Sequence, residues 1–418
     1  MDLEFKKIVS LINEKKFNEA IYKLDPLIDK KPLEFKYHYI KGIANLNLQE
    51  TDKAIKSFDN AIKIDENSYL SYHFRGILNL NKAEYKNAIS DFDKIIHIKP
   101  DFPEAYNNLG IVYYYLGQND EAIENFLKAI NLKNNYIQAQ NNLIEILTQT
   151  QKTKEQDSKI ISTHNYINKK SFEYSSKEFI KDEEIKKIFT ETNNIIKTNI
   201  KDIEFNETQI YRRIDARLKC DRHKRIFNKY NVIPEYCFGC FKVQIEPTSV
   251  LDLIKLYIIF DHLDLNNIKK CMIELRPNIS GKYKGIIYCK SLTEAEQIHN
   301  QLNILISQNF KKIINSNIKR GCSEFAVNFP QYKNLDNDIM HYDQEWKKFE
   351  DLIDERFPDL NFDKKFRSTI KGISLADILI IRNWLHYARM IGDNSYKIIS
   401  TENFKSVFLE NKLKALGY

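Results

Sequence analysis

Three stretches of this chain repeat one pattern: GIANLNLQETDKAIKSF at residues 42–58, GILNLNKAEYKNAISDF at residues 76–92 and GIVYYYLGQNDEAIENF at residues 110–126. Each copy begins with Gly, has Ala at its thirteenth position and ends with Phe, and the copies start 34 residues apart. Small residues allow two helices to approach closely, and the Phe fills the space toward the next pair. The fixed spacing therefore predicts a stack of helical hairpins that bury one continuous core.

The same register extends toward the N-terminus through Ala20 and Pro32. On these residues the first 134 positions resemble the tetratricopeptide repeat (TPR) family, as four helical pairs. A fifth helix near residues 136–148 is expected to cap the stack. The first unit departs from the pattern, with Ile8 and Leu24 where the later copies have Gly and Phe. The resemblance implies an all-α solenoid over residues 1–150.

A TPR solenoid implies a concave groove that binds a protein or a peptide. The candidate groove residues are Tyr72, Tyr106, Asn108 and Asn142. Asn108 and Asn142 lie one period apart, so their amides are expected to form a short ladder to an extended peptide backbone. The alternative is that these asparagines are simply solvated. The resemblance does not identify the partner.

The net charge of this 418-residue chain, +7, comes from one segment. Residues 201–330 hold 21 Lys and Arg against 14 Asp and Glu, whereas the repeats are slightly acidic. With 43 % apolar and 29 % charged residues, wholesale disorder is excluded. No apolar run reaches the roughly 20 residues of a membrane span. We expect a cytoplasmic protein with reduced cysteines, whose basic segment binds an anionic partner.

Basic side chains crowd the stretch Gln209–Arg225, which we expect to form a helix. Arg binds phosphates bidentately, so a helical stripe of guanidinium groups would suit nucleic acid or another anion. The alternative is a solvated helix face with internal salt bridges. The candidate anion-binding residues are Arg212, Arg213, Arg217, Arg222, Lys224, Arg225, Lys282 and Lys284.

Two close pairs of metal-ligand residues occur in the same segment: Cys220 with His223, and Cys237 with Cys240. A tetrahedral Cys₃His set is typical of structural zinc, so the spacing predicts a zinc knuckle. An iron–sulfur cluster, a redox pair and plain buried thiols are the alternatives. The fourth ligand is the least determined, because Cys271, Cys289 or Cys322 can replace His223.

After Cys240 the sequence alternates between strand and helix patterns. We expect strands at residues 241–246, 271–276, 285–289 and 312–325, and helices at residues 249–260 and 292–306. A break of the last strand near Gly321 is the alternative. The order β-α-β-β-α-β predicts a ferredoxin-like α/β domain. RNA-recognition modules share that fold, and residues 282–288 loosely resemble their aromatic motif. An ordinary basic hairpin is the favoured interpretation of the stretch, because Gly285 is out of register and Ile286 stands where that motif has an aromatic residue.

The fold expected overall is multidomain, with the TPR array at residues 1–150 and a linker with one helix at residues 151–200. The basic Cys-rich α/β domain follows at residues 201–330, and a helical region ends the chain at residues 331–418.

Two functions remain open at this stage. The first is a TPR adaptor that binds a protein through its repeats and an anionic ligand, possibly nucleic acid, through a zinc-stabilised basic domain. The second is an enzyme whose groove presents a substrate to a C-terminal site among Arg276, Lys284, Cys322 and Glu324. A deep pocket that gathers Glu274 with these residues would favour the enzyme, although common catalytic motifs are absent from the sequence.

Overall fold

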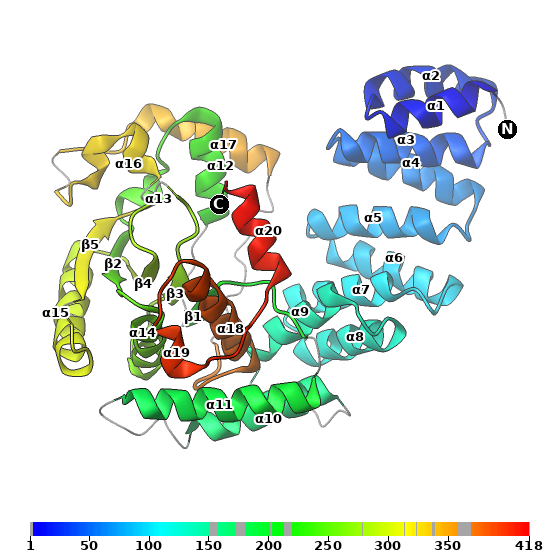
Figure 1. Ribbon diagram of the computed structural model, residues 1–418. Helices are drawn as coiled ribbons and strands as arrows, with labels where there is room; N and C mark the ends of the chain where they lie inside the picture. Colours follow the sequence, from blue (N-terminus) through cyan, green and yellow to red (C-terminus); the bar gives the residue numbers. More distant parts are fainter. Residues whose placement is uncertain are drawn as a thin grey trace. The chain divides into compact units, whose positions relative to one another are not determined.

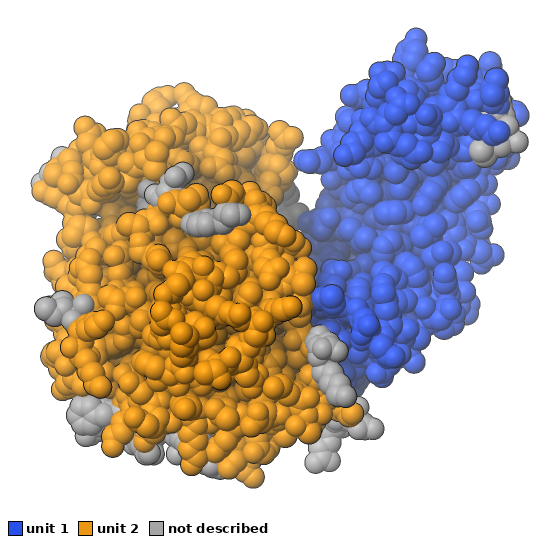
Figure 2. Space-filling view, in the orientation of Figure 1, with its two compact units in different colours: residues 1–142 blue, residues 143–418 orange. Residues whose placement is uncertain are grey.

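A computed structural model shows two compact units, residues 1–142 and 143–418 (Figure 2). It describes residues 3–150, 158–172, 180–200, 203–212, 220–277, 279–312, 314–322, 324–336, 339–357 and 369–417. The boundaries expected near residues 200 and 330 do not separate compact units. The basic segment and the C-terminal helices instead belong to the second unit, because their elements pack on one another.

The first unit is a series of antiparallel helical pairs (Figure 1). Its helices are α1 (Leu3–Asn13), α2 (Phe17–Lys30), α3 (Phe35–Asn47), α4 (Thr51–Ile64), α5 (Tyr69–Asn81), α6 (Tyr85–Ile98), α7 (Pro103–Leu116) and α8 (Asn119–Leu132). Helix α9 (Ile137–Leu147) follows them at the expected place of the capping helix. From α1 to α8 each helix packs on the next one in sequence, as the repeat spacing predicts.

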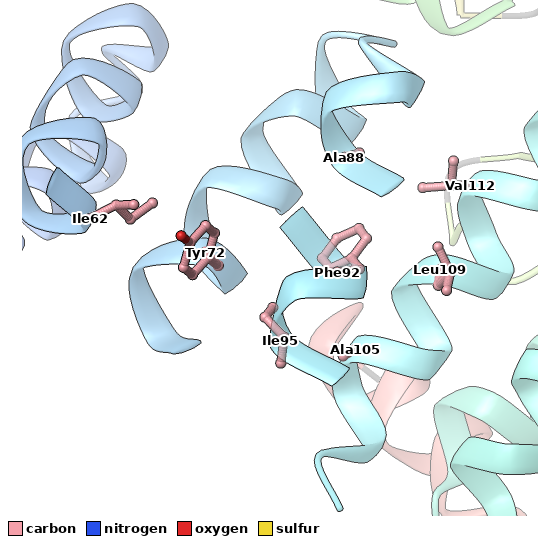
Figure 3. Packing of buried hydrophobic residues seen from close by; sticks show 8 residues of the cluster. All are labelled: Ile62, Tyr72, Ala88, Phe92, Ile95, Ala105, Leu109 and Val112. Atoms are coloured by element: carbon pink, nitrogen blue, oxygen red, sulfur yellow. The ribbon is translucent and has the colours of Figure 1, made fainter. Parts of the chain in front are cut away.

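The repeated Gly and Phe residues meet inside each pair. A Cβ atom added at Gly42 would lie 2.6 Å from the Phe58 ring, and one at Gly76 would lie 2.8 Å from the Phe92 ring. Both rings are fully buried. Figure 3 shows Phe92 on α6 directed toward Leu109 on α7, so each Phe also joins its pair to the next. The packing reason inferred from the repeat is confirmed.

The second unit contains a five-stranded sheet in the order β1-β3-β4-β2-β5, in which every neighbouring pair is antiparallel. The strands are β1 (Gln209–Arg212), β2 (Phe241–Glu246), β3 (Lys269–Ile273), β4 (Tyr283–Cys289) and β5 (Asn315–Arg320). Helix α14 (Val250–His262) connects β2 to β3, and α15 (Leu292–Asn309) connects β4 to β5.

One face of this sheet is apolar and covered by helices. Val243 and Ile287 lie opposite each other on β2 and β4, and both are fully buried. Helix α14 packs on β3 and β4, while α15 runs along β2 and β5 (Figure 1). Close contact between α14 and β4 requires Gly285, since a Cβ there would lie 2.3 Å from Leu256. The other face therefore presents the alternate residues of each strand.

The remaining helices surround this sheet. They are α10 (Lys159–Phe172), α11 (Asp182–Asn199), α12 (Cys220–Tyr230), α13 (Glu235–Phe238), α16 (Phe325–Asn328), α17 (Lys347–Arg356), α18 (Leu375–Met390), α19 (Tyr396–Ile399) and α20 (Val407–Ala415), with 3₁₀ turns at Pro330–Lys333 and Gln344–Trp346. Trp384 of α18 is fully buried, and its indole donates to the carbonyl of Thr208 at 2.8 Å. Of the helices in the described ranges, none has the length and apolar composition needed to cross a membrane.

Two expectations about local structure were wrong. The stretch Gln209–Arg225 is not one helix: it begins as strand β1, residues 213–219 lie outside the described residues, and α12 begins at Cys220. The described part of residues 151–200 contains two helices, α10 and α11, where one was expected, and α10 packs on α11 and α18. The last strand ends at Arg320, next to the break expected near Gly321, and the short helix α16 begins at Phe325.

Candidate functional site

A cavity of about 590 Å³ lies over the sheet face that α14 and α15 leave uncovered. Its lining holds seven basic side chains against three acidic ones among the residues that the structure describes. They are Lys224, Lys242, Lys270, Arg276, Lys284, Lys319 and Lys412 against Asp221, Glu274 and Glu324. A volume of this size is typical of small-molecule sites. We call this cavity the basic pocket.

Strand alternation supplies the floor of the basic pocket. Lys242, Lys270 and Lys284 come from the neighbouring strands β2, β3 and β4, and all three point to the same face. Tyr288 of β4 pairs with Lys242 in the strand register. Since adjacent strands lie about 4.8 Å apart, the sheet brings several ammonium groups close together.

One end of the basic pocket is internally neutralised. Glu274 accepts hydrogen bonds from Arg276 Nε at 2.8 Å and from Lys284 Nζ at 3.0 Å. Arg276 also pairs with Glu324. Burial alone would raise the pKa of Glu274, but the hydrogen bonds from Arg276 and Lys284 outweigh burial and lower that pKa to about 2. Glu274 therefore stays ionised near neutral pH.

The other end contains two lysines that lack a carboxylate partner among the described residues. Lys242 Nζ lies 5.1 Å from the ring centroid of Tyr288, and Lys270 Nζ lies 6.0 Å from it. Lys270 also donates to Gln209 Oε1 at 3.3 Å. Burial, followed by the charge of Lys242, lowers the pKa of Lys270 to about 8. This end of the pocket is therefore strongly positive.

Four thiols lie near one another, and two of them, Cys220 and Cys322, line the pocket beside Lys242. Electrostatic interactions connect each of Cys220, Cys237, Cys240 and Cys322 with the other three. The loops that carry them are bonded together, since Gly321 N donates to Cys240 O at 2.6 Å. Lys242 Nζ approaches Cys322 Sγ at 3.6 Å. Burial raises the pKa of Cys240 to about 11, so this thiol is neutral at physiological pH.

The structure shows the surroundings of His223 and of Cys322, the two residues that compete for the position of the fourth zinc ligand. The His223 ring stacks on Tyr236 at 5.3 Å, and Cys322 lies near the three predicted cysteines. Within the described residues, no three His, Cys, Asp or Glu side chains are arranged as metal ligands. Cys271 and Cys289 are buried in the core of the sheet. Zinc binding therefore stays a prediction.

The prediction that the arginines of residues 209–225 bind an anion is wrong for Arg212 and Arg222, which are buried. Arg212 is 7 % exposed and is bound by Asp261 at 2.6 Å and by Asp377 at 3.1 Å. Arg222 is also 7 % exposed and pairs with Glu350 at 2.9 Å and with Asp354. Buried ion pairs of this kind satisfy internal carboxylates, so neither guanidinium is available to a ligand.

The other anion-binding candidates have three different outcomes. Lys224 and Lys284 line the basic pocket, although Lys284 is paired with Glu274. Arg225 and Lys282 are exposed and are not part of the lining. Arg213 and Arg217 lie outside the described residues.

Sequence reasoning missed Lys242 and Lys270, two lysines of the pocket floor that have no carboxylate partner among the described residues. The period-two pattern of residues 241–246 does place Lys242 on the polar side of its strand. Lys270 precedes the strand that was expected to begin at Cys271. Only the observed strand order shows that the two lysines flank Tyr288.

Comparisons with known proteins concern the first unit. Tetratricopeptide repeat models match residues 35–68 and 103–136, two stretches of equal length that begin two repeat periods apart. The chain therefore contains a TPR segment. No match was found among curated proteins.

Solved TPR structures resemble the chain at low similarity. A crystal structure of MamA is 25 % identical and covers 35 % of this chain and 83 % of its own, with a TM-score of 0.33. YrrB, described as a TPR protein with an unusual peptide-binding site, is 19 % identical and covers 33 % and 71 %, with a TM-score of 0.31. The Arabidopsis OM64 TPR domain is 22 % identical and covers 27 % and 93 %, with a TM-score of 0.26.

The predicted TPR groove residues differ in their burial and in their hydrogen bonds. Tyr72 is 9 % exposed and belongs to the core between repeats. The Asn142 amide donates to Asn107 Oδ1 at 2.8 Å, whereas the ladder was expected to involve Asn108. Tyr106 and Asn108 are half-buried. Asn142 thus forms a hydrogen bond inside the TPR array, and Tyr72 is a packing residue; the ladder to a bound peptide stays a prediction.

Proposed function

We propose that this protein is an adaptor with two binding activities: its TPR array binds a protein or peptide, and its second unit binds a small anionic ligand in the basic pocket. The TPR repeats support the first activity, because stacked repeats present extended binding surfaces. The single observation that carries the second is the surplus of basic over acidic side chains in one enclosed volume. Linking the two modules would raise the local concentration of one ligand near the other.

The pocket favours a small anion over a nucleic-acid strand. Single-stranded nucleic acids are bound by stacking bases on open aromatic faces. The two tyrosines that line the pocket both have a lysine against the ring, with Lys270 Nζ at 5.6 Å from the Tyr211 ring centroid. Nucleic acid remains the second ligand class to be tested.

A direct titration tests the proposed anion binding. The full chain is titrated calorimetrically with phosphate, with citrate and with a single-stranded RNA of 15 nucleotides, each at 50 and 200 mM NaCl. We expect saturable binding of a small anion that weakens in the K242M variant, and little RNA binding at 200 mM NaCl. Absence of binding by all three probes at 50 mM NaCl would refute the proposal.

Catalysis is the second candidate function, because the basic pocket gathers Glu274, Arg276, Lys284 and Cys322. Glu274 is a poor proton carrier near pH 7, since its pKa is about 2. Cys322, close to an ammonium group, is the better candidate nucleophile. Rapid and selective alkylation of Cys322 by iodoacetamide, lost in the K242M variant, would support this function. Equal reactivity of all six cysteines would argue against it.

Two structural proposals accompany these functions. We propose that β2-α14-β3-β4-α15-β5 is a ferredoxin-like unit, on the strand order β5-β2-β4-β3, with β1 added at the edge. We also propose that zinc is bound by Cys220, Cys237 and Cys240, with His223 or Cys322 as the fourth ligand. The electrostatic interactions among the four thiols support this set, although in the described residues they are not arranged as metal ligands. Such an ion would stabilise the wall of the pocket without taking part in chemistry.

A further inference from the structure

The floor of the basic pocket holds two ammonium groups close to one aromatic ring. Lys242 on β2 and Lys270 on β3 flank Tyr288 on β4, which lies between those strands in the sheet. Neither lysine forms an ion pair with Asp or Glu in the described parts of the chain. Their hydrogen-bond partners are Cys322 Sγ for Lys242 and Gln209 Oε1 for Lys270, neither of which is a carboxylate, so a ligand that supplies negative charge here would be favoured.

The hydrogen-bond donors of the pocket favour one kind of anion. Lysine presents a compact charge with three donors, whereas the planar fork of arginine matches a carboxylate. The arginine that lines the pocket, Arg276, is already bound to Glu274 and Glu324. A phosphate group brings a charge near −2 and three acceptor oxygens, which suits two separate lysines.

We propose that the basic pocket binds a small phosphate monoester, with its phosphate bound by Lys242 and Lys270. This inference rests on the anion-binding function proposed above and names the ligand class. The volume of about 590 Å³ leaves space for an organic group beside the phosphate. Met272 and Ile286 offer this group apolar surface, and Gln209 and Gln244 offer polar contacts.

Calorimetric titration of the full chain with four probes tests the inference. The probes are inorganic phosphate, AMP, uncharged adenosine and citrate, all at 50 mM NaCl and pH 7. We expect AMP to bind more tightly than phosphate, and adenosine and citrate at least tenfold more weakly than AMP. In K242M and in K270M the affinity for AMP should fall about tenfold or more, because each variant removes a charge-assisted hydrogen bond. The matched control is K282M, since Lys282 is exposed and does not line the pocket.

Lysine acetylation of the unmodified protein provides a second readout that does not depend on folding of the variants. Saturating AMP should slow the acetylation of Lys242 and Lys270 at least fivefold and leave Lys282 unchanged. If citrate binds in the pocket and AMP does not, the phosphate assignment fails but anion binding stands. If no probe binds and no lysine is protected, both proposals fail. If phosphate binds as tightly as AMP, the pocket is a site for the free ion, and the monoester assignment is wrong.

Discussion

Replacing Arg212 with Met distinguishes a structural arginine from a ligand-binding one. In the structure the Arg212 guanidinium donates to Asp261, to Asp377, to the hydroxyl of Tyr257 at 2.6 Å and to the carbonyl of Gly372 at 2.8 Å. The carboxylate side chains of Asp377 and Asp261 are only 4 % and 12 % exposed. The R212M variant would leave both of these buried charges without their cation. Removing one partner of a buried ion pair destabilises a protein by about 3–5 kcal/mol.

Tryptophan fluorescence reports this effect in the second unit alone, because the two tryptophans, Trp346 and Trp384, both lie there. With a urea slope of about 3 kcal/mol per M for a unit of this size, R212M should lower the unfolding midpoint by about 1–2 M. The control is R225M, which removes the same charge from an exposed position and should change the free energy of unfolding by less than about 1 kcal/mol. If R212M unfolded at the wild-type urea concentration but bound AMP more weakly, Arg212 would be a ligand-binding residue and the burial argument would be wrong.

Three further predictions concern the pocket, the thiols and the repeats. Affinity for AMP should fall as the pH rises through about 8, where Lys270 loses its proton, and this step should be absent in K270M. The groups that act on Lys270 are Lys242, Lys224, Arg276 and the Cys220 thiol, and the Tyr211 and Tyr288 rings lie beside it. Metal analysis should find one zinc per chain. If Cys322 is the fourth ligand, C322S should lose the zinc and H223Q should keep it, and the reverse result would assign His223. A wild-type protein that contains no zinc, and whose stability does not change with a chelator, would refute the zinc site. In the TPR array, F92A should cost about 3–5 kcal/mol, measured by circular dichroism, because the ring is fully buried between helices, whereas Y22F at an exposed position should have little effect.

The repeats could be predicted because their signal is local and periodic. Gly76 and Phe92 are 16 residues apart, and their contact recurs at the same offset in the neighbouring pairs. The alternation in residues 241–246 was equally informative, since it identifies both the strand and the side of the sheet on which Lys242 lies. Patterns of this kind depend only on the geometry of one element or one repeat.

The arginine stripe failed because its charge partners come from distant parts of the chain. Asp261 lies 49 residues after Arg212, and Asp377 lies 165 residues after it. A sequence pattern shows that a basic residue is present, but the fold decides whether a carboxylate meets it. The basic pocket escaped prediction for the same reason, since Lys242 and Lys270 become neighbours of Tyr288 only through the strand order.

These contacts change how the net charge of the chain is interpreted. Part of the basic excess of residues 201–330 is cancelled internally, because Arg212 and Arg222 meet Glu350, Asp354 and Asp377 from the last ninety residues. The C-terminal helices therefore neutralise the basic segment as well as packing on it. Lys242 and Lys270, which have no carboxylate partner among the described residues, lie together in the pocket. A chain-wide +7 would attract any polyanion weakly, whereas two neighbouring ammonium groups in one cavity favour a compact anion that can enter it.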